Sequence, residues 1–224
     1  MLTKYGINNI MFFYVAGIVL IVLAIITENI FFSIILGLPG LILIIFTFIF
    51  FRDPDRKIPQ EALNSESVIV SPADGKVMEV IEINEDTYLH SKAIQISIFL
   101  SPLDVHVNRA PTSGTVRYFR FFPGKYLAAY VPESSVKNVQ THIGVENQYG
   151  KILFKQIVGV LARRLVWDIK EGDTLQVGQR FGMMKFGSRM DVILPVDSEI
   201  RAKSGDRVVA GETIIARVVR EDGG

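Results

Sequence analysis

The chain has 224 residues, and its formal net charge of +1 gives no sign of bulk binding to nucleic acid. It contains no cysteine, which excludes disulfides, cysteine-ligated metals and a cysteine nucleophile. Only three histidines occur, so a histidine-rich metal site is not expected; they are His90, His106 and His142.

Two apolar, uncharged runs open the chain, at residues 10–27 and 30–51, and only Glu28 and Asn29 separate them. A helix that spans a bilayer needs about 20 mainly apolar residues, so the two runs predict a transmembrane hairpin. Pro39 in the second run predicts a kink. A cleaved signal peptide is the competing interpretation, but it has one shorter apolar core, and the second run argues against it.

The charges that flank the hairpin predict its orientation. Lys4 precedes the first run, basic residues follow the second, and the connection carries only Glu28. The positive-inside rule then places both ends in the cytoplasm, with the remaining domain on the cytoplasmic face of the cell membrane. The predicted parts are a hairpin, a polar linker that can meet anionic headgroups and a soluble domain, at residues 1–51, 52–65 and 66–224.

The soluble domain is predicted to be mainly β. Its apolar residues alternate or form short β-branched runs, and no stretch keeps a helical period for 10 to 12 residues. Short helical turns remain possible near residues 59–64 and 132–139. The strand signals are SVIV, KVMEVIEI, AIQISIFL, TVRYFRFF, KILFKQIVGVL, DVILP and ETIIARVV, with turn signals at residues 73–75, 111–114, 149–150, 171–173 and 204–206.

One internal repeat is visible. KEGDTLQVGQRFG begins at Lys170 and KSGDRVVAGETII begins at Lys203, and both read K-x-G-D-x-[LV]-x-x-G. Each Gly-Asp predicts a tight turn that leads into a strand. Two such hairpins suggest a quasi-symmetric pair of sheets that close on each other. The pattern resembles the biotinyl/lipoyl-type barrel-sandwich, which is the fold we expect.

The segment MMKFGSRMDVILP (residues 183–195) carries a Gly-Ser step inside a strand signal. Taken alone, Gly187-Ser188 most simply marks a bulge or turn. A second interpretation is chemical, because the Ser188 hydroxyl can attack the carbonyl that precedes it if the backbone is strained toward it, and glycine permits such strain. Elimination from the resulting ester leaves a pyruvoyl ketone, which supports decarboxylation without an added cofactor.

His106 lies in SPLDVHVNRAP (residues 101–111). In a regular strand, Asp104, His106, Asn108 and Ala110 share one face, which would line up an acid, a base and an amide donor. Histidine is the side chain suited to proton transfer near neutral pH.

The other polar candidates have simpler interpretations. Asp74 belongs to an Asp-Gly pair that is typical of a hairpin turn. We interpret His90 and His142 as surface or structural residues. Four basic residues can hold a phosphate, although a solvated role is commoner for any single one; they are Arg109, Lys125, Arg163 and Arg164.

Taken together, these motifs resemble the phosphatidylserine decarboxylase family in its short, membrane-anchored form, which archaetidylserine decarboxylases share. They run in order from residue 50 to 217 and so cover nearly the whole soluble domain. The matching segments are FFRDPDRKIP, SPADGKV, FLSPLDVHVNRAP, SGTV, PGKY, GVLARRLV, EGDTLQVGQRFGMMKFGSRMDVILP and AKSGDRVVAGETI.

The resemblance implies a proenzyme that cuts itself between Gly187 and Ser188. The β chain would be residues 1–187, and the α chain, residues 188–224, would begin with a pyruvoyl group made from Ser188; the two would form a heterodimer. The serine phospholipid (phosphatidylserine or archaetidylserine) would form a Schiff base with this ketone, lose CO2 and leave as the ethanolamine phospholipid. No metal is implied.

The resemblance also implies site residues. His106 would assist both self-cleavage and protonation of the substrate, with Asp74 as the carboxylate that orients it. Long-form relatives have a second histidine three residues later, where this chain has Arg109. Asn108, Arg109 and Lys125 are candidates for contact with the substrate.

Two other functions remain open at this point. A carrier domain of the biotinyl/lipoyl type would use Lys185 of MMKF as its modified lysine, but it needs only about half of this soluble length. A membrane-anchored adaptor would bind partners through its β domain and would not be cleaved.

Overall fold

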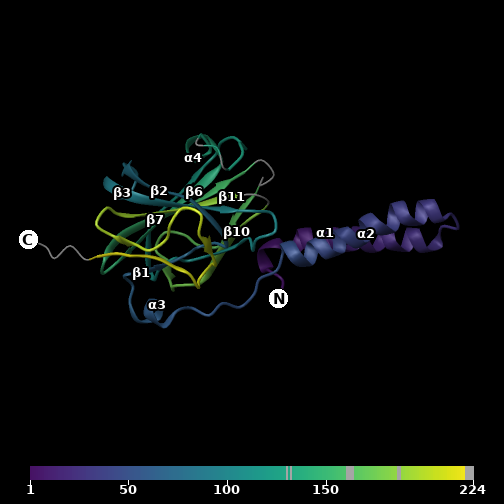
Figure 1. Cartoon of the computed structure of the whole chain (residues 1–224), viewed down its shortest axis with the longest axis horizontal. Coiled ribbons are helices and arrows are strands. Elements are labelled where there is room, and N and C mark those ends of the chain that lie inside the picture. Colours follow the sequence, from purple (N-terminus) through teal and green to yellow (C-terminus); the bar gives the residue numbers. More distant parts are fainter. Residues whose placement is uncertain (130, 132, 160–163, 186–187, 220–224) are drawn as a thin grey trace, which may run out of the picture. The chain divides into compact units, whose positions relative to one another are not determined.

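The computed structural model of the chain describes residues 1–129, 131, 133–159, 164–185 and 188–219. The chain divides into two compact units, Met1–Asp55 and Arg56–Gly224 (Figure 1). The first unit is helical and the second is mainly β, as the sequence predicts.

The first unit is a pair of helices, α1 (Ile7–Ile26) and α2 (Ile30–Phe50), preceded by a short 3-10 turn. The Asn29 side chain caps α2 by accepting a hydrogen bond from the Phe31 amide at 2.9 Å. Among the described residues, these two helices are long and apolar enough to cross a membrane, and their bounds differ from the predicted spans by three residues or fewer.

The two helices approach each other closely at a pair of glycines. A Cβ atom built on Gly17 would lie 3.0 Å from the Gly40 carbonyl, and one on Gly40 would lie 2.9 Å from the Gly17 carbonyl. Small residues allow helix backbones to approach in this way in lipid. Pro39 lies inside α2, which continues through it.

The described part of the second unit consists of strands and two short helices, α3 (Gln60–Asn64) and α4 (Ser134–Lys137), which lie where the sequence left helical turns possible. Its strands are β1 (Val68–Val70), β2 (Gly75–Glu85), β3 (Ser91–Leu100), β4 (Val107–Arg109), β5 (Gly114–Phe122), β6 (Gln140–Asn147), β7 (Gly150–Val158), β8 (Leu165–Trp167), β9 (Thr174–Leu175), β10 (Arg180–Met184), β11 (Ser188–Pro195), β12 (Glu199–Ile200), β13 (Arg207–Val208) and β14 (Ile214–Arg217).

Within the described residues, eight strands form one curled sheet in the order β13-β2-β3-β11-β7-β6-β5-β9. Its paired strands are antiparallel, and it is flanked by two three-stranded sheets, β1-β14-β12 and β4-β10-β8. The order is quasi-symmetric about the β11/β7 pair, because the hairpin β2-β3 corresponds to the hairpin β5-β6. The two edge strands, β13 and β9, also correspond.

The sequence repeat accounts for this symmetry. The Gly172 amide donates to the Val116 carbonyl, and the Gly205 amide donates to the Val77 carbonyl, at 2.9 and 2.8 Å. Both glycines have positive φ, +91° and +98°, which glycine adopts without strain. Each Gly-Asp turn therefore attaches one edge strand to its neighbour, so the predicted tight turns are confirmed. The strands on either side of each turn pair with other strands, β8 with β10 and β12 with β14, and so the turns do not close simple hairpins.

One face of the sheet buries the main hydrophobic core. On β11, Met190, Val192 and Leu194 point into this core, whereas Ile193 packs on the other face with Tyr88 and Leu153. The alternation follows from the two-residue period of a strand.

The close pairing of β2 with β3 leaves no room for a side chain at Gly75. A Cβ atom there would lie 2.2 Å from the backbone carbonyl oxygen of Phe99, which cannot move without opening the β2-β3 pair. We expect Gly75→Ala to lower the midpoint of thermal unfolding by about 6 °C or more, measured by circular dichroism on the full chain in detergent.

Gly172→Ala is the comparison, because Gly172 has positive φ but no atom within 4 Å of the added Cβ. Backbone strain alone should cost about 3 °C there. Equal losses in the two variants would show that the close approach at Gly75 is unimportant.

Candidate active site

Ser188 is the first residue of β11, the strand paired on both sides at the centre of the sheet. It lies opposite Leu100 of β3 and opposite Val158 of β7. It shares strand parity with Met190, so its side chain faces the core, and it is fully buried. Its hydroxyl has no hydrogen-bond partner among the described residues. Gly187, the other half of the predicted cleavage site, lies outside the described residues.

His106 lies beside the segment that leads into Ser188. It immediately precedes β4, and its carbonyl accepts a hydrogen bond from the Met184 amide at 3.3 Å, four residues before Ser188. Its side chain is fully buried. The structure therefore brings the backbones of the two main candidates to one end of the sheet.

The orientation of the His106 ring is set by a backbone carbonyl. Its Nδ1 atom lies 2.8 Å from the carbonyl oxygen of Asp104. Because a carbonyl oxygen can only accept, Nδ1 must carry the proton, and in the neutral ring the lone pair is then on Nε2. This is the tautomer that a general base acting through Nε2 requires.

The carboxylate of Asp74 has partners other than His106. Nη2 of Arg56 lies 2.8 Å from both of its oxygens, and the Ala210 amide donates to Oδ1 at 2.9 Å. Asp104 holds Nδ1 of His106, and the role of Asp74 as the carboxylate that orients His106 stays a prediction. Asp74 still lies near Ser188 in the fold, because its neighbour Gly75 packs on Phe99 at the end of β3.

The predicted row of Asp104, His106 and Asn108 forms only in part, because β4 is restricted to residues 107–109. The Asp104 carboxylate turns away, accepting from the Ser101 amide at 2.8 Å and pairing with Arg207 at 3.0 Å. Asn108 is fully buried, and its Oδ1 accepts from Gln156 at 2.9 Å. Its Nδ2 has no partner in the described part of the chain.

The candidate cations differ in where they lie. Arg109 is buried, and its guanidinium donates to the Gly178 carbonyl at 3.0 Å, a contact that packs β4 against the turn before β10. Lys125 is exposed, and its carbonyl accepts from Val139, whose own carbonyl accepts from Val158, the residue opposite Ser188. Arg164 is exposed, and Arg163 lies outside the described residues.

Lys185 is 7% exposed, and burial, together with the nearby charge of Arg164, lowers its pKa. A lysine that carries biotin or lipoate must be presented to partner enzymes. The burial of Lys185 therefore contradicts the interpretation of this domain as a carrier.

Sequence reasoning missed a buried ionic cluster on the face opposite Ser188. Arg189 is 2% exposed and donates to Asp191 at 2.6 Å, to Glu79 at 3.0 Å and to Ser97 at 2.7 Å. Burial raises the pKa of Asp191, although Arg189 opposes this effect. The available signal was the placement of two opposite charges two residues apart in an otherwise apolar strand.

His142 and His90 have the structural and surface roles predicted for them. His142 is buried on β6, where its Nε2 lies 3.0 Å from Oε1 of Gln140. Burial and the nearby charge of Lys155 lower the pKa of His142 to about 3. His90 is exposed in a turn.

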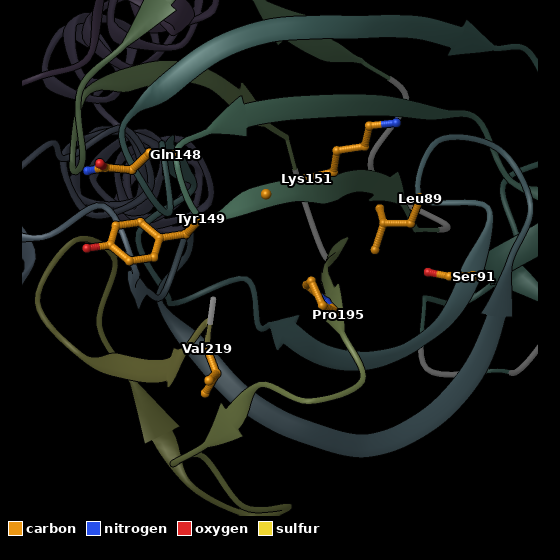
Figure 2. A pocket seen from close by; sticks show the side chains of 8 residues that line it. Leu89, Ser91, Gln148, Tyr149, Lys151, Pro195 and Val219 are labelled. Atoms are coloured by element: carbon orange, nitrogen blue, oxygen red, sulfur yellow. The ribbon is translucent and has the colours of Figure 1, made fainter. Parts of the chain in front are cut away.

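Metal ligands do not gather in this domain, since the described residues contain no group of three or more histidines and carboxylates that could hold an ion. A cavity of about 430 Å³ lies at the other end of the sheet from Ser188 (Figure 2). Its lining includes Pro195, the last residue of β11, and Gly150, the first residue of β7. This cavity is therefore remote from the candidate site.

Comparison with known proteins supplies a family. The family model described as phosphatidylserine decarboxylase matches residues 43–216. A phosphatidylserine decarboxylase proenzyme of Salinibacter ruber is 48% identical over 80% of this chain and 78% of its own length. Proenzymes of the same name from Amoebophilus asiaticus and Chlorobium chlorochromatii are 44% and 41% identical, over 84% and 97% of this chain and 82% and 100% of theirs.

The lowered pKa of His142 predicts a pH dependence of stability. Because folding favours the neutral ring, the stability that it contributes is present above pH 6.5 and is lost as the pH falls toward 3. We expect His142→Gln to remove a decline of about 4 °C per pH unit in the unfolding midpoint across this window. His90→Gln is the control and should follow the unmodified chain. Parallel curves for His142→Gln and the unmodified chain would contradict the assignment.

Proposed function

Because the chain belongs to the phosphatidylserine decarboxylase family and is a carboxy-lyase, we propose that it converts a serine phospholipid to the ethanolamine phospholipid and CO2. We propose further that it does so with a pyruvoyl group made from its own Ser188. The observation that carries this proposal is the position of Ser188, buried at the start of the central strand with its hydroxyl facing the core. Phosphatidylserine and archaetidylserine are both candidate substrates.

The proposed self-cleavage balances without an oxidant or reductant. Oγ of Ser188 adds to the carbonyl carbon of Gly187, and the C–N bond breaks as the nitrogen takes a proton, which leaves an ester. Elimination then breaks the Cβ–Oγ bond and frees Gly187 as a carboxylate. One water molecule hydrolyses the imine form of the remaining dehydroalanine, releasing ammonia and leaving the ketone.

The chain must supply a group that moves these protons, and His106 is the candidate that the contacts favour. Its Nδ1 donates to Asp104, so its lone pair is on the other ring nitrogen, and its carbonyl is bonded to the segment that leads into Ser188. We propose that His106 takes the hydroxyl proton of Ser188 during cleavage and protonates the substrate carbon after CO2 leaves.

Asp74 has a different role in this proposal from the one expected from sequence. Its ion pair with Arg56 and its bond to Ala210 fix the turn before β2, beside the end of β3 where Ser188 pairs. We therefore propose Asp74 as a positioning residue.

The same end of the sheet suits a pyruvoyl group. Such a group supplies a ketone that condenses with an amine and accepts the electron pair left when a carboxylate departs as CO2. Burial of Ser188, His106 and Asn108 keeps water from the reacting atoms. We propose that Asn108 contacts the headgroup through its Nδ2 and that exposed Lys125 approaches the phosphate.

The two apolar helices would anchor the chain in the cell membrane with the β-rich unit on the cytoplasmic face, as the flanking charges indicate. The α chain, residues 188–224, would remain bound to the β chain as a heterodimer. The equivalent Gly-Asp turns support a relation to the biotinyl/lipoyl-type barrel-sandwich.

Intact-mass analysis of the purified full chain tests the nucleophile. We expect two pieces that end at Gly187 and begin at a pyruvoyl-blocked residue 188, and they should co-elute until a denaturant is added. Ser188→Ala should give one uncut, inactive chain. Ser198→Ala is a matched control, because Ser198 is also buried with a hydroxyl that lacks a partner among the described residues, and it should be cut normally. Normal cutting of Ser188→Ala would reject the proposal.

The role of His106 is tested by the rate of cutting. We expect His106→Gln to slow the conversion of one chain to two by about 100-fold or more, since loss of a general base typically has this effect. The conversion can be followed by denaturing gel electrophoresis after expression. His142→Gln, a buried histidine on the opposite face, should be cut at the normal rate. Equal rates in the two variants would remove His106 from the mechanism.

A further inference from the structure

The sheet edge that carries Ser188 also carries several connecting segments. Leu100 at the end of β3 and Val158 at the end of β7 both lie opposite Ser188. Gln140 at the start of β6 pairs with Ile157, and Phe122 at the end of β5 pairs with Gln140. The described residues 101–106, 123–129, 133–139 and 159 therefore adjoin the sheet at this edge. Arg164 lies beside the segment that leads into Ser188, because its carbonyl accepts from the Lys185 amide.

The connection between β5 and β6 at this edge is longer than the corresponding connection between β2 and β3. The β5-β6 hairpin is joined by residues 123–139, whereas the corresponding β2-β3 hairpin is joined by the short turn of residues 86–90. The additional chain lies on the Ser188 side of the sheet. The two halves of the sheet are nearly equivalent. The longer connection therefore distinguishes the Ser188 end, where we propose that the reaction occurs.

Large apolar side chains are exposed along this edge. Leu103 is 68% exposed, Phe121 47%, Tyr126 42% and Val136 81%. Phe121 also stacks on Trp167, with ring centroids 5.6 Å apart. Single exposed apolar residues are ordinary, but several along one edge of a soluble domain indicate a surface that meets an apolar partner.

Exposed cations accompany these side chains, namely Lys125, Lys137 and Arg164. Within the described segments of this edge, Glu133 is exposed and Asp104 is paired with Arg207. Basic residues and aromatic rings beside exposed aliphatic groups are typical of proteins that touch an anionic membrane surface. We name the four apolar residues and three cations together the rim.

We propose that the rim rests in the headgroup region of an anionic phospholipid bilayer, so that a substrate headgroup reaches the Ser188 end of the sheet while its acyl chains stay in lipid. This inference depends on the proposed function for its substrate. The choice of a bilayer over a protein partner follows from the positive charge of the rim and from the chain's own apolar helices, which are long enough to cross a membrane.

The single tryptophan allows a direct test that is independent of activity. The full chain is reconstituted in vesicles of phosphatidylserine and phosphatidylcholine whose acyl chains are brominated near the headgroup. We expect these lipids to quench Trp167, and we expect Leu103→Ser/Val136→Ser to reduce the quenching. If Trp167 is not quenched by brominated lipid but is quenched by aqueous iodide, or if the rim is instead covered by a second copy of the chain in cross-linking, the proposal is wrong.

Kinetics provide the second test. Leu103→Ser/Val136→Ser should be cut completely and should keep its rate on a short-chain phosphatidylserine that is soluble as a monomer. On long-chain phosphatidylserine in vesicles, its apparent KM should rise by about tenfold with kcat unchanged. Leu63→Ser/Val196→Ser is the matched control, because both residues are exposed but lie elsewhere, and it should behave normally on both substrates.

The outcomes separate the two proposals. Equal losses of activity on both substrates, or no loss of activity on vesicles, would contradict the proposal that the rim meets lipid. If the unmodified chain decarboxylates neither substrate, the proposed function fails, and the quenching experiment still decides whether the rim meets lipid.

Discussion

Strand β11 is hydrogen-bonded along both of its edges, to β3 and to β7, and the arrangement of the candidate site depends on this double pairing. A shift of one residue would turn Met190 out of the core and Arg189 into it, so the register is strongly specified. Ser188 consequently has one fixed place at the end of the strand. A break before Ser188 would leave every one of these pairs intact, so the proposed cleavage is compatible with an unchanged sheet.

The charged cluster on the opposite face of β11 also helps to fix the register of this strand. Arg189 joins Asp191 on its own strand, Ser97 on β3 and Glu79 on β2. A buried ion pair is weak support for stability, because apolar residues of similar size often serve as well, but removing one partner leaves an uncompensated charge. The cluster is therefore best understood as a device that admits one register for β2, β3 and β11. It begins immediately after Ser188, the residue that we propose as the nucleophile.

Local signals were sufficient for much of this fold. The apolar runs, the Gly-Asp turns and the alternation in β2, β3 and β5 all formed as predicted, because each depends on residues close in sequence. The beginning of β11 at Ser188, instead of beyond the Gly-Ser step, depends on partners in β3 and β7 that no local pattern specifies. For the same reason, no local pattern gave the partners of Asp74, which are Arg56 and Ala210, both distant in the chain. Ser188 and His106, the two residues on which the proposed site rests, lie in contiguous motifs that could be read directly from the sequence.

The quasi-symmetry of the sheet gives the Ser188 end a counterpart at the opposite end. Because β11 and β7 run antiparallel about the axis, the counterpart of the Ser188 end is the end where β7 begins and β11 finishes. The cavity lined by Gly150, Lys151 and Pro195 lies there. That end has a tight Asn147-to-Gly150 connection, and Gly150 stands where its counterpart strand has the serine. The Ser188 end has the long connection, the buried histidine and the exposed rim. The two halves of the sheet thus share one frame, and the residues that break its symmetry lie at the end where we propose the reaction.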